Sequence, residues 1–134
     1  GRRFRALKLW FLLRAYGLDY LRDMIRNHVT WAQAIAARIA AEPDFALVSQ
    51  PVLSLFSFRY QPPGITGDDL ERLNLALVQR INDDGCIYLT QTRVDGQIAI
   101  RFQVGQFETT EQDVATAFDV IVSTARQPTP EAVL

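Results

Sequence analysis

The sequence has 134 residues, of which 49% are hydrophobic and 22% charged, and a formal net charge of −1. These values are typical of one globular domain with one core, and they disfavour a nucleic-acid partner or an acidic membrane surface. The longest apolar run, residues 9–13, is too short to span a bilayer. The single cysteine, Cys86, cannot form an internal disulfide, so we expect a reducing, cytoplasmic location.

Two helices are predicted at the N-terminal end. The segment 3–16 is apolar on most sides, so more than one of its faces must be covered, and Gly17 is suited to end it. From Leu18 to about Ala41, apolar residues recur at three- and four-residue steps, which predicts a long amphipathic helix that Glu42-Pro43 terminates. Because the sequence begins at Gly1, inside a basic amphipathic segment, we expect it to be part of a longer chain.

Strands and helices alternate after this point. The predicted strands are residues 45–49, 52–60, 86–91 and 97–104, and the predicted helices run from 66 to 84 and from 110 to 126. Gln50-Pro51 is predicted to be a bend or an edge feature, and residues 94–96 a hairpin turn. The order α, α, β, β, α, β, β, α predicts an α+β fold, in which helices pack on one face of a small antiparallel sheet of about four strands.

The last predicted strand distinguishes the two faces of this sheet. Residues 98, 100, 102 and 104 are apolar, whereas Ala99, Arg101 and Gln103 point to the opposite side. Arg59 occupies an equivalent place on the strand 52–60. One face therefore packs on helices, and the other, mixed face is available to solvent or to a second domain.

Several segments of the sequence resemble one enzyme family. The most specific is the opening GRRFRALKLWF, residues 1–11. The others follow in order at Arg14–Gly17, Leu21-Arg22, Ile25–Val29, Leu77–Asn82 with Gly85, Ile100–Phe102 and Thr109-Thr110. Together they resemble the group II pyridoxal-phosphate (PLP) dependent decarboxylases, which include the aromatic-L-amino-acid and histidine decarboxylases. The resemblance covers residues 1–126.

The resemblance implies the C-terminal small domain of a fold-type-I PLP enzyme. In that family a large domain holds the cofactor and a Schiff-base lysine that follows a histidine, and a tyrosine-bearing catalytic loop lies before the segment that starts here. The enzyme is a homodimer with active sites at the subunit interface. On this basis residues 1–41 link the large domain to the small domain, residues 42–126 form the α+β small domain, and residues 127–134 are a disordered tail.

Two arginines are candidates for active-site support. Arg101 matches a position at which glutamate-specific relatives hold a substrate carboxylate, with an interdomain ion pair as the alternative. Arg3 belongs to a basic cluster that opposes the helix dipole, which favours partners in the large domain, with a solvated helix N-terminus as the alternative. Lys8, the only lysine, does not match the lysine motif of the family, and we expect His28 to be packed and Cys86 to be buried. We assign no catalytic, cofactor-binding or metal-ligating residue to this chain.

The sequence thus predicts part of a carboxy-lyase that converts an L-amino acid, preferably aromatic, into an amine and CO2. We expect the chain alone to be inactive and to bind no cofactor. Its expected partners are the large PLP-binding domain, a second subunit and a small amino-acid substrate, with no nucleic acid and no membrane. Two alternatives stay open: a stand-alone α+β interaction or dimerisation module, and a related PLP enzyme such as an aldehyde synthase or cysteine-sulfinate decarboxylase, which would share this domain.

Overall fold

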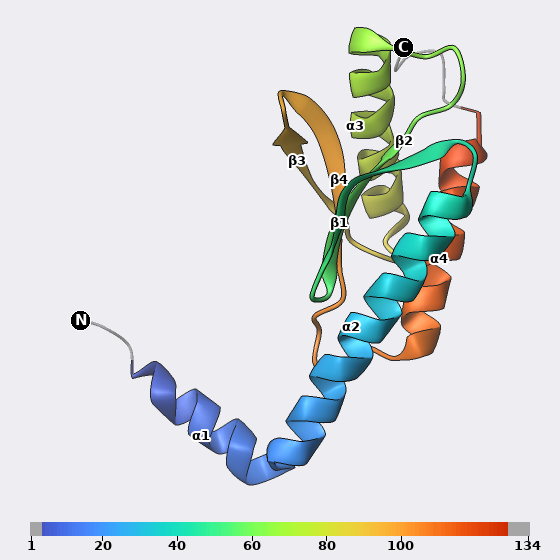
Figure 1. Cartoon of the computed structure of the whole chain (residues 1–134). Helices are drawn as coiled ribbons and strands as arrows, with labels where there is room; N and C mark the ends of the chain where they lie inside the picture. Colours follow the sequence, from blue (N-terminus) through green and yellow to red (C-terminus); the bar gives the residue numbers. More distant parts are fainter. Residues whose placement is uncertain (1–3, 129–134) are drawn as a thin grey trace.

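Two helices precede a layered α+β unit (Figure 1). The structure, a computed structural model, describes residues 4–128. Its elements are α1 (Arg5–Tyr16), α2 (Leu18–Ala41), β1 (Phe45–Val52), β2 (Leu55–Tyr60), α3 (Gly67–Asp84), β3 (Thr90–Val94), β4 (Gln97–Gln103) and α4 (Glu111–Arg126). The predicted class, with four strands and two leading helices, is confirmed. None of the helices within residues 4–128 has the length and apolar content needed to cross a membrane.

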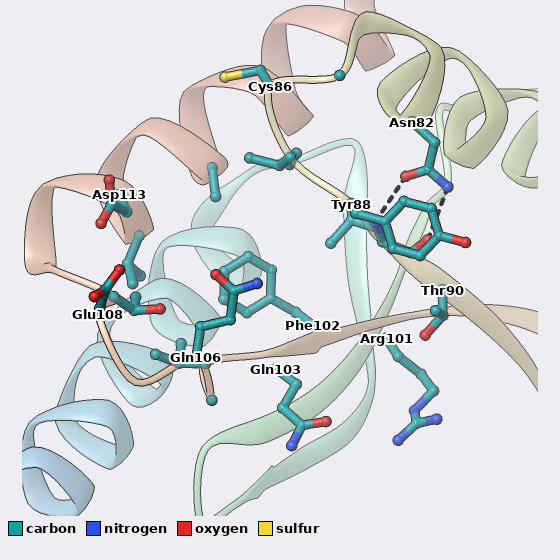
Figure 2. Close-up of a pocket in the computed structure, with 18 residues that line it drawn as sticks. Asn82, Cys86, Tyr88, Thr90, Arg101, Phe102, Gln103, Gln106, Glu108 and Asp113 are labelled. Atoms are coloured by element: carbon teal, nitrogen blue, oxygen red, sulfur yellow. Dashed lines mark hydrogen bonds between the residues drawn. The ribbon is translucent and has the colours of Figure 1, made fainter.

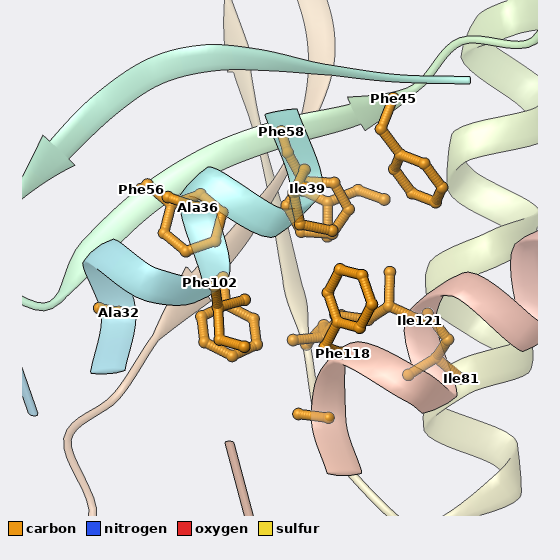
Figure 3. Close-up of a cluster of buried hydrophobic side chains, with 14 of the residues drawn as sticks. Ala32, Ala36, Ile39, Phe45, Phe56, Phe58, Ile81, Phe102, Phe118 and Ile121 are labelled. Carbon is orange, nitrogen blue, oxygen red and sulfur yellow. The ribbon is translucent and has the colours of Figure 1, made fainter. Parts of the chain in front are cut away.

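The four strands form one antiparallel sheet in the order β1-β2-β4-β3. Helices α2, α3 and α4 lie on one face of this sheet, whereas α1 extends away from the unit (Figure 1). Phe56, Phe58 and Phe102 point from the sheet into the space under the helices, where they meet Ile39 and Phe118 (Figure 3). This core follows the predicted alternation, because every second residue of an inner strand faces the helices.

The first hairpin turns later than the sequence predicts. β1 continues through Gln50 and Pro51, and the turn lies at Leu53 and Ser54, where Leu53 has a φ of 54°. Pro51 is tolerated because β1 is an edge strand, on which a missing N–H can face away from the ladder. Register shifts on both sides of Ser49 absorb the irregularity.

The third strand is shorter than predicted. Residues 86–89 are irregular, and β3 begins at Thr90. The cause is Asn82 on α3, whose Oδ1 accepts from the Leu89 N–H at 2.8 Å and whose Nδ2 donates to the Leu89 carbonyl at 3.0 Å. One side chain therefore takes both backbone groups of Leu89, which leaves neither for a neighbouring strand.

β2 and β4 separate beyond the paired residues Phe58 and Ile100. On the β2 side of the opening, the backbone of Tyr60 is bound by Asn74 of α3. The Tyr60 N–H donates to Asn74 Oδ1 at 2.9 Å, and Asn74 Nδ2 donates to the Tyr60 carbonyl at 2.9 Å. Asn74 is fully buried, so its amide replaces the strand partner that Tyr60 has lost.

On the β4 side of the opening, Ile98 is bound in the same way by two charged side chains. Its N–H donates to Glu71 Oε2 at 2.8 Å, and its carbonyl accepts from Arg59 Nε at 2.5 Å. Arg59 also donates to Glu71 Oε1 at 2.8 Å. The sequence placed Arg59 on the mixed sheet face, but Arg59 is only 6% exposed, because it fills the opening instead. We refer to Arg59, Glu71 and Asn74 as the strand fork.

A second polar cluster joins the segment after α2 to the end of α4. Arg126 donates to the Asp44 carboxylate at 2.8 and 3.0 Å and to Glu42 at 2.5 Å. The hydrogen bonds from Arg126 lower the pKa of Asp44 below its ordinary value, and the two carboxylates raise the pKa of Arg126. The last turn of α4 is therefore held against the start of the sheet.

The strand fork predicts unequal effects for two arginines that pair with the same carboxylate. Arg59→Met should lower the free energy of unfolding by about 3 kcal/mol, because Glu71 then keeps a poorly solvated charge without its main partner. Arg93→Met is the control: Arg93 pairs with Glu71 at 3.3 Å, but its side chain is 60% exposed, so the change should stay below about 0.5 kcal/mol. Chemical denaturation measures both variants, and equal losses would contradict the fork assignment.

The Arg126 cluster predicts a pH-dependent contribution to stability. Because the folded pKa of Asp44 lies below its ordinary value of 3.8, the contribution is complete above that value and is lost as the pH falls through the folded pKa. The difference in unfolding free energy between the wild type and Asp44→Asn should therefore stay constant from neutral pH down to the ordinary value of 3.8 and shrink as the pH is lowered further. Thermal denaturation across a pH series tests this, and a difference independent of pH would refute it.

Candidate functional site

Arg101 lies on the sheet face that the helices leave uncovered. In the inner strand β4 it is paired with Ser57 of β2 and with Thr90 of β3. Figure 2 shows the Arg101 and Gln103 side chains leaving the strand on the side opposite Phe102. Arg101 is half-buried, and it forms no ion pair with any side chain of residues 4–128. An arginine in a fixed strand with free donors is suited to bind a carboxylate.

A groove of about 830 Å³ opens beside Arg101. It is lined by the irregular segment after α3, by the end of β4 and by the first turns of α4 (Figure 2). Buried Phe102, Val104 and Val114 supply apolar lining, whereas Tyr88, which is 79% exposed, belongs to the open part. The groove therefore combines an apolar base with exposed polar and aromatic groups.

The titratable groups in this groove are not arranged as a catalytic pair. Asp113 accepts from the Thr110 N–H at 2.8 Å, and the Thr110 hydroxyl accepts from the Asp113 N–H at 3.2 Å, which is the capping box predicted from the sequence. These bonds with Thr110 lower the pKa of Asp113, so its carboxylate is ionised at neutral pH. Cys86 is exposed, not buried as expected, and it lies apart from Asp113 in Figure 2. The described residues of the groove can hold a ligand, but they offer no nucleophile that is paired with a base.

Helix α1 is uncovered on every side. None of its 12 residues is buried. Its exposed large apolar side chains are Leu7, Leu9, Trp10, Phe11, Leu12, Leu13 and Tyr16. Lys8 is also exposed on α1, and it does not line the groove. The sequence-based expectation that α1 needs cover on more than one face is therefore not met by contacts within residues 4–128.

Two further residues considered from the sequence are Arg3 and His28. Arg3 lies outside the described residues, so the structure does not place it relative to Arg101. His28 is 5% exposed, as expected for a packed histidine, and its ring lies 5.8 Å from that of Trp31. Its Nε2 atom has no hydrogen-bond partner among residues 4–128.

Known proteins match the chain in sequence and in fold. A family model described as "Pyridoxal-dependent decarboxylase conserved domain" matches residues 1–61. Tyrosine decarboxylase 4 of Petroselinum crispum is 37% identical over 125 residues, which are 90% of this chain and 25% of that protein. The crystal structure of Oryza sativa TDC with PLP and tryptamine matches with a TM-score of 0.84 and 32% identity, over 93% of this chain and 27% of that chain. In both sequence and fold, the chain is thus similar to pyridoxal-dependent decarboxylases.

The chain spans about a quarter of the length of the relatives that it matches. The crystal structure of Rhodiola rosea 4-hydroxyphenylacetaldehyde synthase also matches, with a TM-score of 0.80 and 32% identity over 94% of this chain and 27% of that chain. Relatives named for different reactions thus share this part of the decarboxylase fold. The shared fold alone does not separate their chemistry.

The sequence does not reveal every residue that shapes this region. Asn74 carries a usable signal, because an amide inside the apolar stripe of Leu73 and Leu77 must find buried backbone partners. No signal in the sequence places Tyr88 in the groove, since the residue types around it are typical of a strand. Its segment is kept out of the sheet by Asn82, which lies on α3.

Asn82 predicts a local effect on the groove. Asn82→Ala removes both bonds to Leu89 and should destabilise residues 85–89 by about 1–3 kcal/mol, which is roughly a tenfold to hundredfold loss of protection of the Leu89 amide. Asn27→Ala, at an exposed position of α2, is the control and should leave that amide unchanged. Hydrogen exchange measures both, and unchanged Leu89 protection in Asn82→Ala would show that another contact holds the segment.

Proposed function

We propose that this chain is part of an enzyme that decarboxylates an L-amino acid, preferably aromatic, to the amine and CO2. The observation that carries the proposal is the agreement of sequence and fold with tyrosine decarboxylase and with the tryptamine-bound structure over nine-tenths of the chain. The exposed apolar helix α1 supports a role inside a larger assembly. We place the enzyme in the cytoplasm, which the single, exposed Cys86 supports.

We infer that residues 4–128 do not hold PLP, the cofactor of the decarboxylases that the chain resembles, by themselves. A lysine that holds PLP needs a pocket around its amine, but Lys8 is exposed on α1. A phosphate is bound by free backbone N–H groups such as those of a helix N-terminus, but the α4 N-terminus beside the groove is already capped by Thr110 and Asp113. We therefore assign the cofactor and its lysine to a part of the protein outside this chain.

The contribution of this chain is a docking surface. Apolar side chains surround α1, and burying such a helix between two surfaces removes all of them from water. We assign one side of α1 to the large PLP-binding domain of the same protein and the other side to a second subunit of a homodimer. The helix-free sheet face around Arg101 faces the same large domain.

Arg101 is the residue of this chain that we place at the active site, as a donor to the substrate carboxylate. Its planar guanidinium can bind both carboxylate oxygens, and it has no carboxylate partner among residues 4–128. Arg3 supports the same site by holding groups of the large domain. The assignment of Arg3 rests on the family resemblance of residues 1–11.

An aldehyde synthase is the second candidate, because a synthase of this kind matches the chain as well as decarboxylases do. Such an enzyme would use the same docking surface and, with O2 as the oxidant and with water, release an aldehyde, CO2, NH3 and H2O2 instead of an amine and CO2. A stand-alone interaction module is less consistent with the structure, since it would leave α1 exposed to water.

Product analysis of the full-length protein tests these candidates. Purified protein supplied with PLP is incubated with L-tyrosine, L-tryptophan or L-phenylalanine, and the products are separated by chromatography. Amine and CO2 support the decarboxylase, and the aldehyde supports the second candidate. Binding of PLP without turnover of any of the three would refute an aromatic substrate, and the 134-residue chain is the control, in which we expect no turnover.

The assignment of Arg101 predicts a change in substrate binding. Arg101→Met should raise KM about tenfold to a hundredfold, which corresponds to about 1.5–3 kcal/mol for one hydrogen-bonded charge pair. Arg93→Met is the matched control, an exposed arginine on the neighbouring strand that binds Glu71 and should leave KM unchanged. Steady-state kinetics of both variants decide the question. A normal KM together with lower stability in Arg101→Met would assign Arg101 to an interdomain ion pair.

A further inference from the structure

A single glycine separates α1 from α2. Gly17 has φ 78° and ψ 162°, a backbone conformation that is essentially restricted to glycine. Its N–H donates to the Leu13 carbonyl at 3.0 Å, and its carbonyl accepts from the Leu21 N–H at 3.4 Å. No atom lies within 4 Å of a Cβ built at Gly17, so crowding does not impose the bend. Contacts beyond this residue must fix the direction of α1.

Three aromatic rings meet at this hinge. Tyr16, the last residue of α1, stacks on Tyr20 in the first turn of α2, with centroids 5.4 Å apart and an interplanar angle of 24°. Phe107, from the segment between β4 and α4, lies 4.6 Å from the Tyr16 ring and 5.9 Å from the Tyr20 ring. Rings at these separations attract each other. We refer to Tyr16, Tyr20 and Phe107 as the aromatic clasp.

The segment that carries Phe107 is bonded to the β1–β2 turn at its start, closes a turn on itself and runs directly into α4. Before it, the Val104 N–H donates to the Ser54 carbonyl at 3.0 Å, and Val104 is buried. After it, the Thr109 N–H donates to the Gln106 carbonyl at 3.2 Å, and the α4 capping box follows directly. Phe107 therefore presents its ring to the hinge from a fixed support.

The same segment also borders the groove. Gln106 and Glu108, the neighbours of Phe107 in sequence, line the groove beside Arg101 (Figure 2). Phe107 does not line it. Alternate residues of one short segment thus touch the groove and the hinge.

We propose that Phe107 is a positioning residue that sets the direction in which α1 leaves the α+β unit. Because α1 and Arg101 dock on the same large domain in the function proposed above, their relative placement has to be fixed, and the inference rests on that docking. The aromatic clasp fixes it by tying the end of α1 to the segment that follows the Arg101 strand. Without the Phe107 ring, the glycine hinge leaves α1 a wider range of directions.

Hydrogen–deuterium exchange of the full-length protein, read by mass spectrometry, tests this proposal without reference to activity. Phe107→Ala should raise exchange at the hinge amides Gly17 and Leu21 about twofold to tenfold, the size expected for the loss of one aromatic contact. Exchange in the core of α2, at Ile35 and Ile39, should not change and serves as the internal reference for folding. Phe107→Tyr keeps a ring of the same shape and should restore wild-type exchange.

Two further variants separate positioning from a general effect on the segment. Gln106→Ala changes the groove side of the same segment and should leave hinge exchange unaltered. Tyr16→Ala combined with Phe107→Ala should raise hinge exchange by less than the product of the two single effects, because both substitutions remove the contact between Tyr16 and Phe107, and only Tyr16→Ala also removes the stack on Tyr20. Unchanged hinge exchange in Phe107→Ala, or failure of Phe107→Tyr to restore it, would overturn the inference. A wild-type protein that forms no amine would refute the proposed function instead, and the hinge result would stand by itself.

Discussion

Backbone groups that leave a sheet need new partners, and in this chain helix α3 supplies them from one side. Glu71, Asn74 and Asn82 lie three and eight residues apart, so they follow one stripe of the helix. Through them α3 is bonded to Ile98 in β4, to Tyr60 at the end of β2 and to Leu89 before β3. These bonds leave α3 little freedom to slide or rotate on the sheet. They also decide where the chain leaves α3, and therefore where the groove beside Arg101 opens.

The surfaces proposed to dock on the rest of the enzyme are those that have no apolar cover or no ionic partner within residues 4–128. Helix α1 buries none of its residues, and Arg101 keeps its charge without a carboxylate nearby. In isolation, the apolar surface of α1 is exposed to water unfavourably and the Arg101 guanidinium has no anion to bind. A complementary surface would bury the first and pair with the second. Among residues 4–128 the buried side-chain polar atoms of the α+β unit, in contrast, have hydrogen-bond partners, with the exception of His28 Nε2. This contrast between a self-sufficient core and an incomplete periphery is what we expect of one part of a larger catalytic assembly.

Elements governed by local pattern were predictable from the sequence. The helix from Leu18 to Ala41 has the predicted bounds, since a long apolar repeat and a terminating proline act within one segment. The Thr110 capping box was predictable for the same reason. Gln50-Pro51 was predicted to be a bend or an edge feature. The bend was wrong, because β1 continues through both residues, whereas the edge feature is confirmed, because Pro51 lies on the edge strand β1. The predicted start of the third strand at residue 86 was wrong, because Asn82 of α3 binds the backbone of Leu89 and the strand begins only after it.

The candidate site was predictable only in part for the same physical reason. Alternation along one strand is enough to place Arg101 opposite the core residue Phe102. The buried state of Arg59 depends on a bond to Ile98, which is 39 residues away, and no local pattern carries that information. The exposure of Cys86 follows from the same irregular segment that was predicted to be a strand.

The strand order has a consequence for how the protein is made. β2 is an inner strand, but its second neighbour, β4, is synthesised only after α3 and β3. Until Gln103 has left the ribosome, the nascent hairpin of β1 and β2 keeps one edge of unpaired backbone groups. Such an edge is a template for pairing with other chains. The interval between synthesis of the second strand and the fourth is therefore one in which the nascent chain is exposed to pairing with other chains.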